Sequence, residues 1–192
     1  MKPGRPVRKS VQRWRGLAVP VMLTVLAAQS IPAKAAPESL TVTAEAQLRF
    51  GAFIVVSQGS RRVSASGTVT NDSIYPVGNS PVGPAQFTVT YDRGNANQKP
   101  LNIVFDVSLA GVSPVNQAGV RGTLSAFDSD LAGASVLVPG RTYRAKITNC
   151  VTRTCSQTFR VGARLDVTRS SGGGVLTIAL PIVANLISSD KL

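Results

Sequence analysis

The chain has 192 residues, with 21 Lys and Arg against 9 Asp and Glu, and it contains no histidine. This length is enough for one well-packed domain, and the lack of histidine excludes Ser-His-Asp and Cys-His catalytic arrangements. Seven of the basic residues precede residue 36, so a mature chain that starts there carries a net charge of +5. Such a small and dispersed excess is ordinary solubility charge, and we expect no nucleic-acid partner.

Residues 1–35 have the three parts of a secretory signal peptide. A basic segment without acids precedes the apolar run Leu17–Ala28, and Ala33-Lys34-Ala35 fits the small-x-small rule for cleavage. The run is too short to span a bilayer. We expect export by the general secretory route to the periplasm, cell surface or medium, with no membrane span after cleavage. An uncleaved N-terminal anchor is the alternative. Residues 36–192 then form a single domain.

The first pattern of the mature chain is a strict alternation of apolar and polar residues that ends before Gly51. Such a period of two predicts a long strand with one buried face. The apolar positions are Leu40, Val42, Ala44, Ala46, Leu48 and Phe50.

Similar alternation follows in several shorter segments, separated by turn-forming residues. The segments are 63–70, 85–91, 101–109, 143–148, 159–168 and 176–182. Turn-formers at Ser57–Ser60, Pro76–Pro84 and Gly111–Gly119 separate some of them, and only Ser129–Val138 is ambiguous, with room for one helical turn. Short alternating strands at this spacing predict an all-β chain. The fold class we expect is an immunoglobulin-like antiparallel β-sandwich with Greek-key connections, after the N-terminal signal peptide.

Cys150 and Cys155 are the only cysteines. In an exported chain an even count favours a disulfide, and four intervening residues suit the tip of a hairpin. A redox-active pair is the alternative, although its usual spacing is tighter. Placing Cys150 opposite Cys155 puts the apolar faces of the two strands on opposite sides of the sheet. The sequence therefore predicts a β-bulge between Ile147 and Phe159 that restores the common face.

No acid/base pair, metal-ligand set or phosphate-binding loop is recognisable in the sequence. We therefore expect a protein that is not an enzyme, with no catalytic residue, no cofactor and no metal.

Five segments carry a resemblance to a known family. They are Leu48–Gly51, Val63–Thr70, Pro84–Thr90, Thr158–Gly162 and Leu165–Val167. Together they resemble the bacterial domain-of-unknown-function family 4402 over most of residues 40 to 187. The resemblance implies an exported, β-rich protein, and it assigns no activity. Asp92–Pro100 and the cysteine pair depart from the shared pattern. The segment Leu48–Gly51 is also similar to that of spore-coat-U-type pilins, which implies assembly by a chaperone and usher.

The long N-terminal strand suggests how such a protein acts. An alternating strand can fill the groove of a neighbouring subunit's incomplete sandwich. The alternative is that it completes its own sandwich, beside the closing strand Val175–Ile187. We expect an exported, non-catalytic structural or cell-surface protein, such as a fimbrial subunit, whose partners are like subunits or a periplasmic chaperone and usher. The alternative is a monomeric periplasmic binding module with recognition loops at Pro76–Pro84 or Asp92–Pro100.

Overall fold

The computed structural model describes residues 36–95, 97, 99–117, 119–169 and 174–191, which form thirteen strands in two antiparallel sheets. The signal peptide expected over residues 1–35 lies outside this part of the chain. In chain order the strands are β1 (Ser39–Ala46), β2 (Leu48–Val63), β3 (Val69–Pro76), β4 (Val82–Gly83), β5 (Ala85–Asp92), β6 (Leu101–Leu109), β7 (Val115–Gln117), β8 (Val120–Ser129), β9 (Val136–Leu137), β10 (Thr142–Cys150), β11 (Thr154–Arg169), β12 (Gly174–Ile178) and β13 (Ile182–Lys191).

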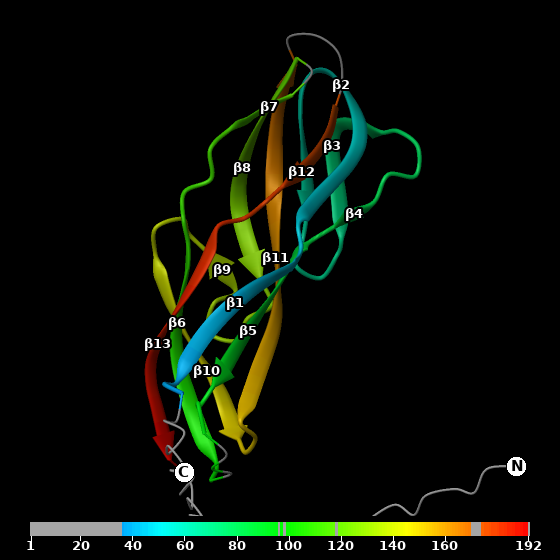
Figure 1. Cartoon of the computed structure of the whole chain (residues 1–192). Coiled ribbons are helices and arrows are strands. Elements are labelled where there is room, and N and C mark those ends of the chain that lie inside the picture. Colours follow the sequence, from blue (N-terminus) through cyan, green and yellow to red (C-terminus); the bar gives the residue numbers. More distant parts are fainter. Residues whose placement is uncertain (1–35, 96, 98, 118, 170–173, 192) are drawn as a thin grey trace, which may run out of the picture. The chain divides into compact units, whose positions relative to one another are not determined.

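The larger sheet is organised around β11 (Figure 1). One edge of β11 pairs first with β5 and then with β2, and its other edge pairs with β8. Beyond these, β1 pairs with β5, while β3, β4 and β12 pair with β2, and β7 and β9 pair with β8. The sheet is curled, and both β11 and β2 change pairing partners along their length.

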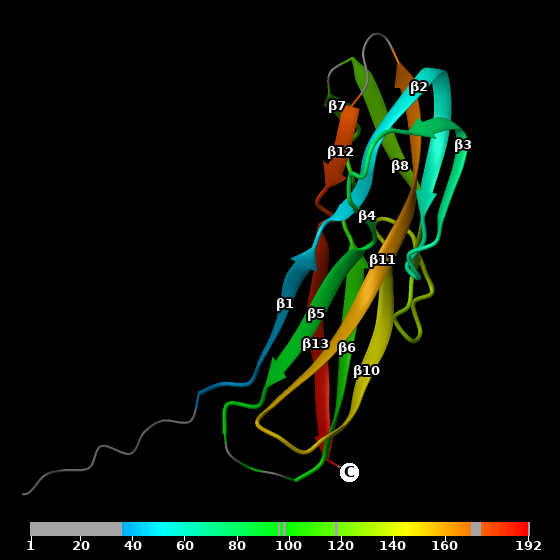
Figure 2. The same ribbon diagram turned by 90° about the vertical axis from the view of Figure 1, so that its right-hand side faces the viewer.

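The smaller sheet has the order β10-β6-β13. It forms a second layer against β1, β5 and β11 (Figure 2). The two layers meet at both margins, where β1 contacts β13 and β10 contacts β11 without forming a ladder.

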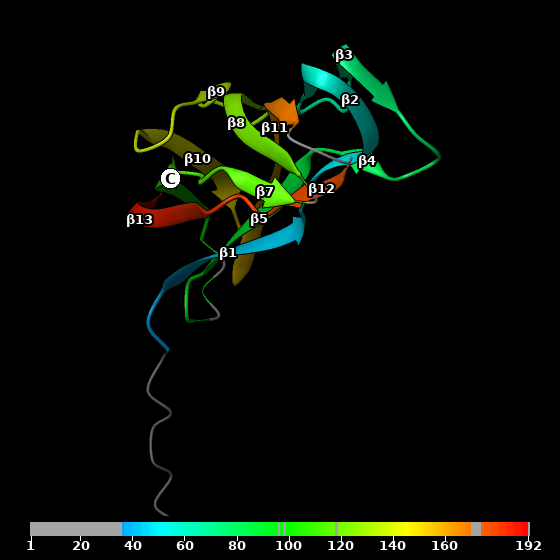
Figure 3. The ribbon, with the colours of Figure 1, turned by 90° about the horizontal axis from the view of Figure 1, so that it is seen from above.

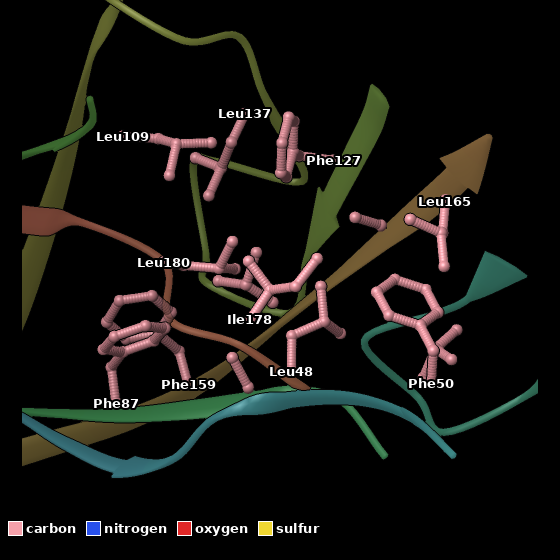
Figure 4. Packing of buried hydrophobic residues seen from close by; sticks show 14 of the residues in the cluster. Leu48, Phe50, Phe87, Leu109, Phe127, Leu137, Phe159, Leu165, Ile178 and Leu180 are labelled. Atoms are coloured by element: carbon pink, nitrogen blue, oxygen red, sulfur yellow. The ribbon is translucent and has the colours of Figure 1, made fainter. Parts of the chain in front are cut away.

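The core lies between these layers and continues inside the curl of the larger sheet. In β5 and β6 every second residue is buried, as the alternation predicts. The rings of Phe87 and Phe159 stack with centroids 5.6 Å apart, and Leu48, Ile178 and Leu180 lie next to them (Figure 4). Each fully buried side chain of this size stabilises the fold by about 1.5–3 kcal/mol.

The predicted N-terminal strand differs from the observed one. Gln47 divides it into β1 and β2, and the ladder of β1 with β5 has a register shift between Ala44 and Ala46. The predicted turn Ser57–Ser60 is wrong, since β2 runs through it to Val63.

The predicted strand Val63–Thr70 is also wrong, because it straddles a turn. Ser64 donates its N–H to the carbonyl of Thr68, and the N–H of Gly67 donates back to Ser64. Gly67 adopts a φ of 87°, a backbone conformation that L side chains rarely take. Local hydrogen bonds of this kind compete with a ladder, so a serine-rich segment that alternates can still turn.

The predicted cysteine hairpin is wrong as well. β10 pairs with β6 in the smaller sheet, whereas β11 pairs with β5 in the larger one. The conflict between the two apolar faces is therefore resolved by a change of sheet. A register irregularity does occur between Ile147 and Cys150, but it lies in the ladder of β10 with β6. Asn149, within it, has a φ of 57°.

Two further segments differ from expectation. Ser129–Val138 holds a turn and the short strand β9, with no helical turn. The closing segment is two strands, since the chain passes Pro181 between β12 of the larger sheet and β13 of the smaller one. The broader expectation of an all-β chain with antiparallel sheets is confirmed for the described residues.

Candidate functional site

The residues predicted for strand pairing divide into a loosely held and a firmly held group. Leu40, Val42 and Ala46 of β1 are half-buried, and Ala44 is exposed. In contrast, Leu48 and Phe50 of β2 are both 0% exposed. β1 therefore has the partial burial of an edge strand, whereas Leu48 and Phe50 of β2 belong to the core.

β1 forms a single ladder, with β5 of the same chain. Leu40 lies opposite Tyr91, Val42 opposite Val89 and Ala44 opposite Phe87. In the part of the chain that the structure describes, the other edge of β1 forms no ladder, although it lies next to β13. This edge presents unpaired backbone N–H and C=O groups, with which a further strand can pair.

One carboxylate holds the start of β1. Glu38 Oε2 accepts hydrogen bonds from the hydroxyls of Tyr91 and Ser189, each at 2.8 Å. Tyr91 is on β5 and Ser189 is on β13, so Glu38 connects β1 to both sheets. Burial raises the pKa of the Tyr91 phenol above its ordinary value, which keeps the hydroxyl a donor.

The disulfide lies near this end of the molecule. Cys150 and Cys155 are bonded with Sγ atoms 2.02 Å apart, and they join the end of β10 to the start of β11. Beside it, the guanidinium of Arg93 donates to the carbonyl of Cys150 at 2.7 Å and also to the carbonyls of Asn97 and Lys99. The disulfide thus links the two sheets, and the hydrogen bonds of Arg93 hold the loop that follows β5 against Cys150.

That loop belongs to the predicted recognition segment Asp92–Pro100. Arg93, Asn95, Asn97 and Lys99 line a small hollow of about 160 Å³ together with Glu38. At the start of the same segment, the backbone N–H of Gly94 and the guanidinium of Arg153 lower the pKa of Asp92.

A larger hollow, of about 470 Å³, lies on the outward face of β3, β2, β11 and β8. Seen from above, these four strands follow one another across the curled sheet (Figure 3). Its lining is mainly polar and includes Ser60, Asp72, Arg121, Arg164 and Asp166. Sequence reasoning missed this site, because polar residues on every second position indicate a solvated face. The only available signal was that these positions carry both arginines and aspartates.

Two kinds of feature are absent from the described residues. These residues contain no group of three or more Cys, Asp or Glu side chains close enough to hold a metal ion. They also contain no helix that is long and apolar enough to cross a membrane.

The fold and these sites define an all-β protein of two antiparallel sheets joined by one disulfide. Residues 40–185 match the domain of unknown function DUF4402. The match covers most of the chain, and the protein belongs to this family. Comparisons with curated proteins and with solved structures give no match.

Proposed function

We propose that this is an exported, non-catalytic structural or cell-surface protein, pilin-like in its assembly, whose copies associate by exchanging β1. The proposal rests on how β1 is held. β1 forms one ladder, its apolar side chains are mostly half-buried, and Gln47 separates it from β2. A strand held this way can leave its own β5 and pair with the β5 of a neighbour.

The surface of β5 that β1 covers would favour pairing with the β1 of another copy. If β1 leaves, Phe87, Val89 and Tyr91 of β5 lose the strand that lies opposite them. These side chains are at most 3% exposed, so an empty groove is unfavourable and a second copy's β1 restores it. The partners proposed are like subunits, with a periplasmic chaperone and usher during assembly.

Two finer features go with this proposal. One is an N-terminal signal peptide over residues 1–35. The other is an immunoglobulin-like Greek-key sandwich, made by β1-β5-β11 and β13-β6-β10. It is supported by the chain's crossing between the layers from β5 to β6, from β10 to β11 and from β12 to β13.

Cross-linking of the mature chain tests the exchange. In Val42→Cys/Val89→Cys the two new thiols lie opposite each other, so oxidation joins whichever β1 and β5 are paired. We expect a ladder of covalent oligomers on non-reducing gels that grows with protein concentration. The matched control is Lys146→Cys/Val104→Cys, a pair on β10 and β6, which should give monomers alone. Monomers alone from the β1–β5 pair at every concentration would refute strand exchange.

The second candidate is a monomeric periplasmic binding module. The small hollow lined by Arg93, Asn95 and Lys99 supports it, because this loop stands on a rigid sandwich and Arg93 anchors it to Cys150. The cross-linking result separates the two candidates, since a monomeric module gives only the intramolecular bond.

A further inference from the structure

The larger hollow, on β2, β3, β8 and β11, lies outside the strands that take part in the proposed exchange. The ladders of β3, β2, β11 and β8 place its side chains in rows across the sheet. The middle row is Asp72, Ser60, Asp166 and Thr123. None of the residues that line the hollow belongs to β1 or β5.

On the floor of the hollow, the charges of Arg164 and Asp166 neutralise each other. Arg164 Nε donates to Asp166 Oδ1 at 2.8 Å, and Ser125 Oγ donates to Asp166 Oδ2 at 2.8 Å. Ser60, next to Asp166 in the ladder, is only 8% exposed. Gly59 allows β3 to approach here, since a Cβ would lie 2.8 Å from the backbone oxygens of Asp72 and Ser73.

The two sides of the hollow carry opposite charges that are not neutralised. On β8, the exposed Arg121 makes no ion pair or side-chain hydrogen bond within the described ranges. On β3, Asp72 accepts one side-chain hydrogen bond, from Ser73 Oγ at 3.2 Å, and pairs with no described cation. β8 and β3 are three strand spacings apart, about 14 Å measured along the sheet. Arg121 and Asp72 form no ion pair with each other.

We propose that this hollow binds a short zwitterionic peptide, with its ammonium group at Asp72 and its carboxylate at Arg121. A guanidinium binds a carboxylate through two parallel hydrogen bonds, and an aspartate accepts from an ammonium. A tripeptide in extended conformation is about 10 Å long, which suits the space between the two charged side chains. The neutral floor leaves Ser60 and Thr123 to contact the peptide backbone.

A neutral oligosaccharide is the main rival ligand, because the hollow is polar. It would not require the opposite charges on the two sides, and no aromatic side chain lines the hollow to stack on a sugar ring. The charge pattern therefore favours the zwitterion.

NMR titration of the ¹⁵N-labelled mature chain tests the ligand class. Trialanine is the probe, compared with N-acetyl-trialanine amide, which lacks both charges, and with maltotriose. We expect trialanine to shift amide signals along β2, β3, β8 and β11, and to bind more weakly as salt is added. The blocked peptide should not shift these signals. Equal binding of the blocked peptide, binding of maltotriose alone, or no shift with any probe would overturn the proposal.

Charge reversal tests the orientation. Arg121→Glu and Asp72→Lys should each weaken trialanine binding by up to about five-fold, as expected for the loss of one exposed ion pair. The double variant should regain affinity, because the peptide can bind in the opposite direction. Arg141→Glu, an exposed arginine outside the hollow, is the matched control and should bind as the unaltered chain does. Failure of the double variant to recover, in a protein with a well-dispersed spectrum, would contradict the assignment.

Discussion

At the scale of single residues, Arg61 is the most unusual side chain. It is 5% exposed, and its Nε and Nη1 have no hydrogen-bond partner among the described residues. It lies opposite Leu165 in the ladder, so it faces the core and not the polar hollow. Burial lowers the pKa of its guanidinium. Buried donors without partners cost about 1–3 kcal/mol each, so this arginine reduces the stability of the isolated chain.

Arg61→Met should therefore stabilise the protein. Methionine has a similar length without the buried donors, and we expect the free energy of unfolding to rise by about 1–3 kcal/mol in urea titrations. Arg62→Met is the control, since the neighbouring Arg62 is exposed and pairs with Asp128 at 3.1 Å, and the change there should stay below about 1 kcal/mol. A clear loss of stability in Arg61→Met would mean that Arg61 has an acceptor in the folded protein.

Buried charged residues such as Arg61 could not be predicted from the sequence. The alternation predicted that Leu48, Phe50 and Phe87 are buried, because apolar side chains on one face of a strand must find a core. Arg61 was not predicted to be inside, because a charged residue is assigned to the surface by its type alone.

At the scale of elements, β1 is held to the molecule by one ladder, with β5, and by contacts with β13. Its apolar side chains are half-buried, and Glu38 makes two hydrogen bonds through one oxygen, to Tyr91 and Ser189. Edge strands with few buried contacts open more readily than central ones.

Glu38→Ala should loosen β1 without unfolding the rest. Loss of hydrogen bonds to a charged group costs about 1.5–3 kcal/mol, so the amides of β1 should exchange with solvent about ten-fold faster or more. Hydrogen exchange followed by NMR or mass spectrometry measures this. Glu45→Ala is the control, because Glu45 is exposed on the same strand and its side chain makes no hydrogen bond or ion pair with a described residue. Unchanged exchange in Glu38→Ala would show that Glu38 does not hold the strand.

Element types were more predictable than element bounds. β5 and β6 follow their alternation closely, because each is a regular strand with one buried face. The long strand β2 was not predicted, since Ser57–Ser60 has turn-forming residues and only its partners β3 and β11 keep it extended.

At the scale of the whole molecule, β11 connects the two parts of the core. Its first half pairs with β5 opposite the smaller sheet, and its second half pairs with β2 and β8 inside the curl. Buried residues of both parts belong to one continuous hydrophobic cluster. The two parts should therefore unfold together.

Leu165→Ala tests this coupling. Leu165 is 0% exposed in the second half of β11, and removing its side chain should lower the free energy of unfolding by about 2–5 kcal/mol. We expect one transition, with equal calorimetric and van't Hoff enthalpies. Val56→Ala, at a side chain that is 73% exposed, should change little. Two separate transitions in Leu165→Ala would show that the curl and the sandwich fold independently.

The pairing of strands could not be predicted from this sequence. A period of two tells which side chains share a face, but it does not tell which strand lies next to which. Cys150 and Cys155 were close enough in sequence to suggest one hairpin, yet they lie on strands of different sheets. The polar hollow was not predicted for the same reason, since β8 and β11 come from parts of the chain that are distant from β2 and β3.

The bond between Ser189 and Glu38 brings the two ends of the described chain within hydrogen-bonding distance of each other. A few added residues could therefore connect the carboxyl end to the start of β1, and the polypeptide could be reopened at the exposed turn around Gly78, giving a circular permutant with the same ladders. In such a permutant β1 would be tethered on both sides, which should prevent the exchange proposed for it.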